Sequence, residues 1–119
     1  MKKGIFLGEV KVLWLADPRK MQLLEDFVYL DSNGLEWRAT KGSIIDGASI
    51  PKFFWRVIGS PFIGLYRDPS VIHDVYCDSK LRPAQDVHNC FNEMMFTKDV
   101  KETKRETMFN AVNTFGPRW

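Results

Sequence analysis

Length, composition and charge favour one small globular domain. With 119 residues, 45% of them hydrophobic, the chain can bury a core without disulfide or metal staples. A formal charge of +2 is too small a surplus to indicate a nucleic acid as the main partner, although it leaves room for a small basic groove. We therefore expect a single domain over residues 1–119.

The first third of the chain is predicted to form three antiparallel strands. Apolar residues alternate loosely from Ile5 to Leu15, as in an exposed strand, and a second run extends from Gln22 to Leu30. Asn33-Gly34 then supplies the positive φ angles of a tight hairpin turn, and residues 35–40 return as the partner strand. A meander of three strands with one apolar face needs a covering layer, so we expect helices to pack on it.

Three to four helices are predicted to form that layer, which makes the fold class α+β. Proline stands at the start of three of them, where its missing amide hydrogen costs nothing. Asp68 is expected to cap the second helix through its carboxylate. The expected ranges are 51–58, 69–79, 83–98 and 100–114.

Two cysteines, Cys77 and Cys90, fall in predicted helices and could make only one bridge. The first three residues are followed by Gly4 and a mixed segment rather than by an unbroken apolar core, so a signal peptide is not expected. Reduced thiols in a cytosol follow from these two observations. No apolar stretch reaches the length of a membrane span.

A His73–Asp74 pair on the predicted helix 69–79 is the strongest candidate for a functional site. His73 lies opposite the apolar face of Val71, Ile72 and Val75, so the helix is either buried all round or lines a cleft. An imidazole can act as a general base when a carboxylate fixes its tautomer. Asp74 is poorly placed for this task, because adjacent helical residues diverge by about 100°.

The carboxylate that orients His73 is therefore expected to be Asp46, in the loop 45–49, or Asp86, near the start of the helix 83–98. Asp74 would then be free to bind a cation or a substrate group. One histidine with three carboxylates also suits a hard divalent cation, with Asp74 and Asp46 as candidate ligands. The alternative is a structural one, in which the pair satisfies buried backbone groups and ties loops to helices.

The segment 46–51 also has two interpretations. Its glycine and small residues, Ser49 among them, could let the backbone approach a ligand and direct amides at an anion. Alternatively, Asp46 and Ser49 form only a turn and a helix cap. Lys52 and Arg56, four residues apart, could bind phosphate or merely form the solvated side of their helix.

Four further residues complete the predictions. Arg67 and Tyr76 join the candidate ligand-binding residues, although Tyr76 and Cys77 suit packing better than a nucleophilic role. His88 is expected to be exposed, because it lies on a mostly polar flank of its helix.

Several of these motifs occur together in a known family. Asp-Gly-Ala-Ser-Ile-Pro at 46–51, Phe-Trp at 54–55, His-Asp at 73–74 and Phe-Gly at 115–116 resemble a family of small phage and bacterial proteins catalogued as a domain of unknown function. The likeness covers nearly the whole chain. It implies a phage or prophage origin and supplies no reaction. It also points to a characteristic polar set of Asp46, His73, Asp74 and Asp86.

The chain departs from that family pattern at one turn and shares a helix motif with a second group. Tyr76 and Cys77 share the turn where the pattern favours tyrosine, which leaves the position of the hydroxyl open. The His-Asp helix is also similar to that of secreted phospholipases A2, where the histidine is a base and the next aspartate binds calcium. Without their dense disulfides and glycine-rich calcium loop, the similarity is one of local chemistry.

We predict a phage-encoded, hydrolase-like protein in which His73 activates water. Lys52, Arg56 and Arg67 suggest a small phosphorylated or nucleotide-like substrate, and a divalent cation is the one cofactor that the polar residues suggest. One alternative is a phage protein that binds and sequesters a small ligand, such as a nucleotide signal, without chemistry. Another is a virion or assembly component that contacts phage or host proteins. The location would be the host cytoplasm, or the virion for a structural component.

Overall fold

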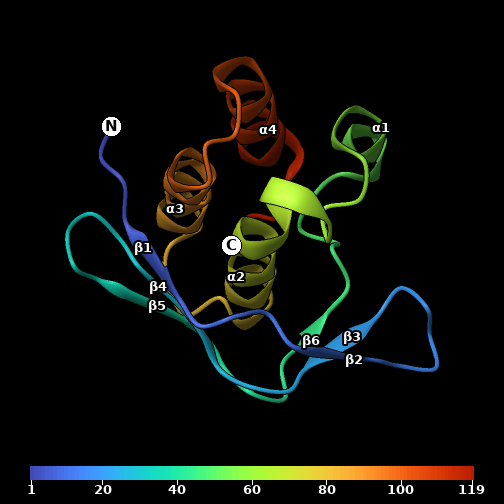
Figure 1. Cartoon of the computed structure of the whole chain (residues 1–119). Helices are drawn as coiled ribbons and strands as arrows, with labels where there is room; N and C mark the ends of the chain where they lie inside the picture. Colours follow the sequence, from blue (N-terminus) through green and yellow to red (C-terminus); the bar gives the residue numbers. More distant parts are fainter.

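The computed structural model describes the backbone of residues 1–119 and every side chain except that of Val57. It confirms the α+β class, since the strands end at Ile45 and all the helices follow (Figure 1). One sheet has the order β1 (Ile5–Leu7), β4 (Phe27–Leu30), β5 (Glu36–Ala39), and the other the order β2 (Val12–Trp14), β3 (Met21–Leu23), β6 (Ile44–Ile45). Both sheets are antiparallel.

Two sheets stand in place of one three-stranded meander because both long predicted strands bend. Gly8, with a φ of 85°, follows the end of β1, and a bend at Leu24 and Glu25 separates β3 from β4. Each long strand therefore contributes to both sheets. The hairpin predicted at Asn33-Gly34 is present between β4 and β5, with a φ of 81° at the glycine.

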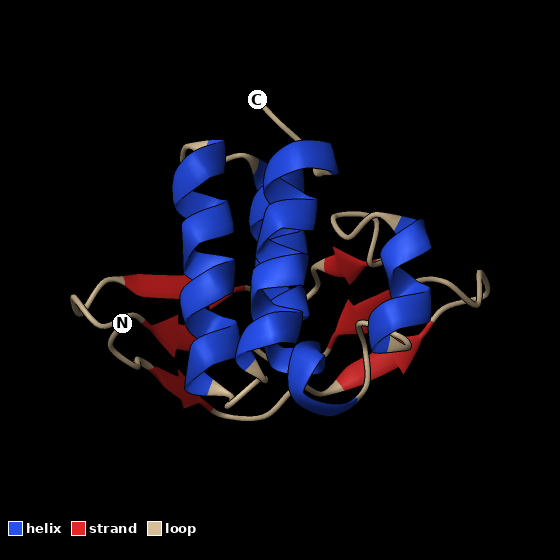
Figure 2. Ribbon diagram, turned by 90° about the horizontal axis from the view of Figure 1, so that it is seen from above, coloured by secondary structure: helices blue, strands red, loops and turns tan.

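The helices form a layer over the strands (Figure 2). They are α1 (Trp55–Ile58), α2 (Arg67–Ser79), α3 (Ala84–Thr97) and α4 (Glu102–Phe115), with single 3-10 turns at Lys52–Phe54 and Gly64–Tyr66. Helix α2 is central, because it contacts both sheets and α3. This helix is buried on almost every side, and its last turns also line a pocket.

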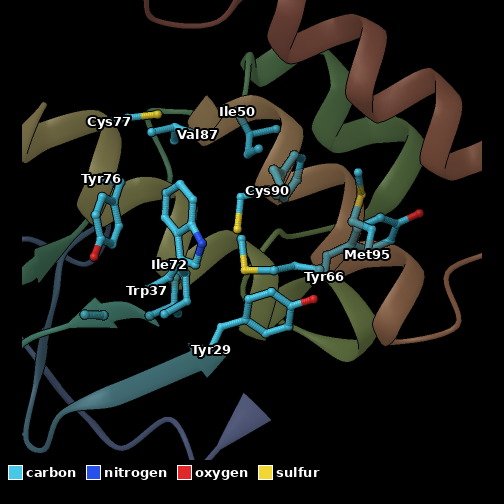
Figure 3. Packing of buried hydrophobic residues seen from close by; sticks show 14 of the residues in the cluster. Tyr29, Trp37, Ile50, Tyr66, Ile72, Tyr76, Cys77, Val87, Cys90 and Met95 are labelled. Atoms are coloured by element: carbon cyan, nitrogen blue, oxygen red, sulfur yellow. The ribbon is translucent and has the colours of Figure 1, made fainter. Parts of the chain in front are cut away.

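The hydrophobic core lies between the strands and helices α2, α3 and α4. Tyr29 and Trp37 reach from the strands toward Ile72 and Cys90 of the helices (Figure 3). One apolar stripe of α3 is buried: Ala84, Val87, Cys90, Phe91 and Met94. Both cysteines are free, as predicted. Within the described part of the chain, no helix combines the length and apolar character needed to cross a bilayer.

Asp68 does not cap α2 as predicted. The helix begins two residues earlier than predicted, at Arg67, and none of the described side chains caps it. The Asp68 carboxylate instead accepts a salt bridge from Lys98 Nζ at 2.9 Å. Since Lys98 follows the last residue of α3, this pair joins the start of α2 to the end of α3.

Candidate functional site

Asp74 fixes the loop that follows β6. Its two carboxylate oxygens accept the backbone N–H groups of Asp46, at 3.1 Å, and of Ser49, at 3.2 Å. Asp46 in turn accepts the N–H of Ala48 at 2.9 Å, which closes the turn predicted for this segment. Burial raises the pKa of Asp74, and the backbone hydrogen bonds from Asp46 and Ser49 oppose this rise. The loop therefore takes its shape from a carboxylate on the central helix.

Gly47 makes this loop conformation accessible. Its φ is 72°, in the left-handed region that glycine tolerates best. A Cβ atom at this position would lie 2.9 Å from Phe62 Cζ and 3.0 Å from Trp55 Cζ2. The glycine therefore allows both the turn and the close approach of two aromatic rings.

His73 connects this loop to α3 through a chain of hydrogen bonds. Its Nδ1 lies 3.1 Å from Ser49 Oγ, and its Nε2 lies 2.9 Å from Nδ1 of His88. The other nitrogen of His88, Nε2, lies 3.0 Å from the carbonyl oxygen of Pro117. Four segments distant in the sequence thus meet in one relay, defined as Ser49, His73, His88 and the Pro117 carbonyl.

The donor and acceptor of each hydrogen bond in the relay follow from its last member, the Pro117 carbonyl. A carbonyl oxygen only accepts, so His88 Nε2 donates its proton to Pro117. Neutral His88 then accepts at Nδ1 from His73 Nε2–H, which leaves His73 Nδ1 free to accept the Ser49 hydroxyl proton. Burial supports the neutral state, because it lowers the pKa of His73 well below 6.5 and also lowers the pKa of His88.

Three predictions about the histidines are corrected by this geometry. Neither Asp46 nor Asp86 orients His73, because both ring nitrogens have other partners. Asp86 is exposed and lines a separate pocket of about 270 Å³. It lies two residues before His88 on α3, so its side chain points to nearly the opposite side of that helix. His88 itself is fully buried, not exposed.

The chain end explains the burial of His88. Pro117 accepts its hydrogen bond, and the ring of Trp119 lies 6.2 Å from the His88 ring. The sequence did contain a signal for this burial. His88 follows Ala84 by four residues and precedes Phe91 by three, which places it on the same helical face as the buried stripe.

Cys77 is the second residue of the site that sequence reasoning missed. It follows His73 by one helical turn, and its Sγ lies 3.6 Å from His73 Nε2 and 3.8 Å from Nδ1. Burial raises the pKa of the Cys77 thiol to about 12, and the charge of Asp74 contributes to this rise. One donor atom each from His73, Cys77 and His88 lie within 4.8 Å of one another. The spacing of four between His73 and Cys77 was the available signal.

A pocket of about 310 Å³ adjoins the relay. Its lining includes Ser49, Asp74 and Cys77, each of which contacts His73 or the loop that His73 binds. His73 has no exposed surface, so it reaches the pocket through Ser49. The charged lining residues are three carboxylates and one ammonium group: Asp46, Asp74, Asp78 and Lys20.

The structure does not bring the remaining predicted ligand-binding residues to this pocket. Lys52 lines a different hollow of about 180 Å³, and Arg56 is exposed on α1. Arg67 pairs with Asp68 at 3.3 Å and lines a third, largely apolar pocket. Tyr76 is a packing residue, as expected: its ring contacts Trp37 and its hydroxyl accepts the Arg38 N–H at 2.9 Å. The basic residues therefore form no common phosphate site.

Comparisons with known proteins place the chain among relatives without an assigned activity. Residues 21–112 match the family model described as "Protein of unknown function (DUF1353)". Two curated proteins of Sinorhizobium fredii (strain NBRC 101917 / NGR234) are similar: uncharacterized protein y4jT is 47% identical over 87% of this chain, and uncharacterized protein y4iH is 36% identical over 98% of it. The aligned regions are 31% and 49% of the lengths of those relatives, so this chain corresponds to half of each or less. No solved structure gives a significant match.

Proposed function

The chain belongs to the family described as "Protein of unknown function (DUF1353)", and from that premise we propose that it is a hydrolase in which Ser49 is the nucleophile and His73 the general base. The single observation that carries this proposal is the relay from Ser49 Oγ through His73 and His88 to the Pro117 carbonyl. A nucleophile beside a base that a third group orients is the usual arrangement for covalent acyl transfer.

Each member of the relay has one role in the proposed reaction. Ser49 Oγ attacks a carbonyl carbon, an O–C bond forms, and the hydroxyl proton moves to His73 Nδ1. His73 becomes an imidazolium, and its Nε2–H remains hydrogen bonded to neutral His88. The leaving group departs with the proton from His73. Water then cleaves the acyl-Ser49 ester by the same proton transfers and regenerates the hydroxyl.

The pocket supports an uncharged or cationic substrate rather than a phosphorylated one. Three carboxylates and one ammonium group surround the opening, and this excess of negative charge would repel a phosphate. A carbonyl ester or amide meets that condition. The substrate expected from Lys52, Arg56 and Arg67 has less support, because these side chains do not meet at Ser49.

The proposal is tested with phenylmethylsulfonyl fluoride, which sulfonylates an activated serine without requiring knowledge of the substrate. The wild-type chain should gain one sulfonyl group, and peptide mapping should place it on Ser49. Ser49→Ala should not be modified, and His73→Gln should react about 10²- to 10⁴-fold more slowly. Ser60→Ala is the matched control and should react as wild type, because Ser60 Oγ accepts the Phe62 N–H and has no histidine partner among the described side chains.

A second candidate function is a structural one, favoured by the complete burial of His73 with both of its nitrogens paired. On that interpretation the relay only ties the loop 46–49 and the chain end to the helices, as a structural or assembly protein would require. Unmodified wild-type protein, or labelling of Ser49 that persists in folded His73→Gln, would overturn the hydrolase. Circular dichroism of each variant establishes that it is folded.

A phage or prophage origin and a location in the host cytoplasm or virion stay predictions.

A further inference from the structure

The two histidines of the relay and the neighbouring Cys77 have the donor types of a soft-metal site. His73 and Cys77 lie one turn apart on α2, and His88 faces them from α3. Their donor atoms lie within 4.8 Å of one another, and all three side chains are buried. Imidazole nitrogen and cysteine sulfur are the ligands that Zn²⁺ selects, whereas Mg²⁺ and Ca²⁺ prefer oxygen.

Two of the separations between donor atoms are near those that such an ion requires. For bonds of about 2.05 Å to nitrogen and about 2.3 Å to sulfur, a tetrahedral centre separates two nitrogens by about 3.3 Å and nitrogen from sulfur by about 3.6 Å. His73 Nε2 lies 2.9 Å from His88 Nδ1 and 3.6 Å from Cys77 Sγ. The two imidazoles need to separate by a few tenths of an ångström. The Cys77 side chain must also rotate, because its Sγ lies almost as far from His73 Nδ1, at 3.8 Å, as from Nε2 and is therefore beside the ring.

The outer partners of both histidines also suit a metal. A ligating histidine usually donates its other N–H to a carbonyl or a similar acceptor, which fixes the tautomer. His88 Nε2 already donates to the Pro117 carbonyl, so its Nδ1 carries a lone pair. That lone pair accepts from His73 in the metal-free relay and would bind the metal in its place. With a metal on Nε2, His73 would carry its proton on Nδ1, and the Ser49 hydroxyl oxygen, 3.1 Å away, would accept it. Cys77 and Ser49 both line the pocket, which provides an entry path for the ion.

We infer that His73, Cys77 and His88 bind one Zn²⁺ ion, with the fourth position left to water or to a group from the pocket. The Cys77 thiol loses its proton to solvent as the Zn–S bond forms, and no electron is transferred. This binding does not depend on the proposed hydrolysis. One consequence does: with Nε2 on the metal, His73 must carry its proton on Nδ1 and can no longer accept the Ser49 proton. Zn²⁺ would therefore prevent the transfer of the Ser49 proton to His73.

Cobalt is the probe for the test, because Co²⁺ takes zinc sites and reports its ligands by absorption. The full chain, stripped with a chelator and kept reduced, should bind one Co²⁺ with the visible bands of a tetrahedral centre and a near-ultraviolet sulfur-to-cobalt band. Equimolar Zn²⁺ should abolish both. Cys77→Ala should lose the sulfur band and bind at least about 10-fold more weakly. Cys90→Ala is the matched control and should behave as wild type, because Cys90 is also a buried free cysteine but does not belong to the cluster of His73, Cys77 and His88.

The outcomes separate this inference from the proposed function. A sulfur band that persists in Cys77→Ala, or cobalt absorption equal in wild type and Cys77→Ala, means adventitious binding only and overturns the metal site. If Cys77→Ala does not fold, Cys77→Ser with a melting curve replaces it, since Zn²⁺ should raise the melting temperature of wild type more than that of the variant. If the protein binds the metal but the metal-free protein gains no sulfonyl group, the proposed hydrolase is refuted and the metal site stands. Sulfonylation that Zn²⁺ does not slow would contradict the inhibition.

Discussion

Burial holds both histidines of the relay in their neutral form. Desolvation lowers the pKa of His73 well below 6.5 and lowers that of His88 too. In the unfolded chain the pKa of both imidazoles returns to about 6.5. As the pH falls, the unfolded chain therefore binds protons before the folded chain does. The stability that the neutral pair contributes is therefore fully present above about pH 6.5. It is lost as the pH falls through that value toward the lower pKa values of the folded state.

We expect the free energy of unfolding, measured by urea titration, to fall as the pH is lowered from about 7.5 to about 5. The slope should approach about 1.4 kcal/mol per pH unit for each neutral histidine. His88→Gln should show a shallower slope, because one titrating group is gone. Burial raises the pKa of Asp74, so this group increases the free energy of unfolding as the pH falls. Its contribution is the same in wild type and variant. Identical slopes in wild type and variant would contradict the role of His88.

Asp74 contributes to stability through the two backbone groups that it accepts. Asp74→Asn keeps the size of the side chain but turns one acceptor into an N–H donor facing another donor. We expect a loss of about 1–3 kcal/mol in the free energy of unfolding, since a buried N–H then has no partner. Asp78→Asn, on the exposed part of the same helix, is the control and should change it by less than about 0.5 kcal/mol. Equal effects of the two substitutions would show that Asp74 does not hold the loop.

Local patterns predicted the secondary structure elements well. Prolines at 51, 69 and 83 lie at or near the starts of helical segments, and the turn predicted at Asn33-Gly34 joins β4 to β5. Each of these signals acts within a few turns of chain. The division of the meander was missed, because the bends at Gly8 and at Leu24 depend on how the strands pair across two sheets.

The loop 46–49 depends on Gly47 for two separable reasons, its positive φ and the two aromatic rings beside it. Gly42 shares only the first, with a φ of 91° and no atom within 4 Å of the position of a Cβ. Gly42→Ala should therefore cost about 1–2 kcal/mol from the backbone alone. Gly47→Ala should cost a further 1–3 kcal/mol or so, because the methyl group would overlap Phe62 and Trp55. Equal losses on denaturant unfolding would mean that the rings move aside without strain.

The relay itself could not be predicted from the sequence, since its members are brought together only by long-range packing. Ser49, His73, His88 and Pro117 come from a loop, two helices and the chain end. Helical periodicity placed His73 and Cys77 on one face but says nothing about what faces them. The predicted partner of His73 was therefore a carboxylate, Asp46 or Asp86, whereas in the folded chain the partner is a second histidine.

The chain end closes the relay from outside, and Trp119 holds it in place. Its indole Nε1–H donates to the Arg82 carbonyl at 2.8 Å, which keeps Pro117 over His88. Trp119→Ala should let water reach His88. Because desolvation is the largest cause of its lowered pKa, that pKa should rise toward 6.5, as followed by NMR titration of the ring proton. The melting temperature should fall by a few degrees, corresponding to about 1 kcal/mol.

Trp14→Ala is the matched control, because Trp14 is a largely exposed residue of β2 and belongs to the sheet of β2, β3 and β6. It should leave the titration of His88 unchanged. A His88 pKa that is the same in wild type and Trp119→Ala would mean that α3 and its neighbours alone desolvate the ring. In that case Trp119 would not be needed to shield the His88 ring from water.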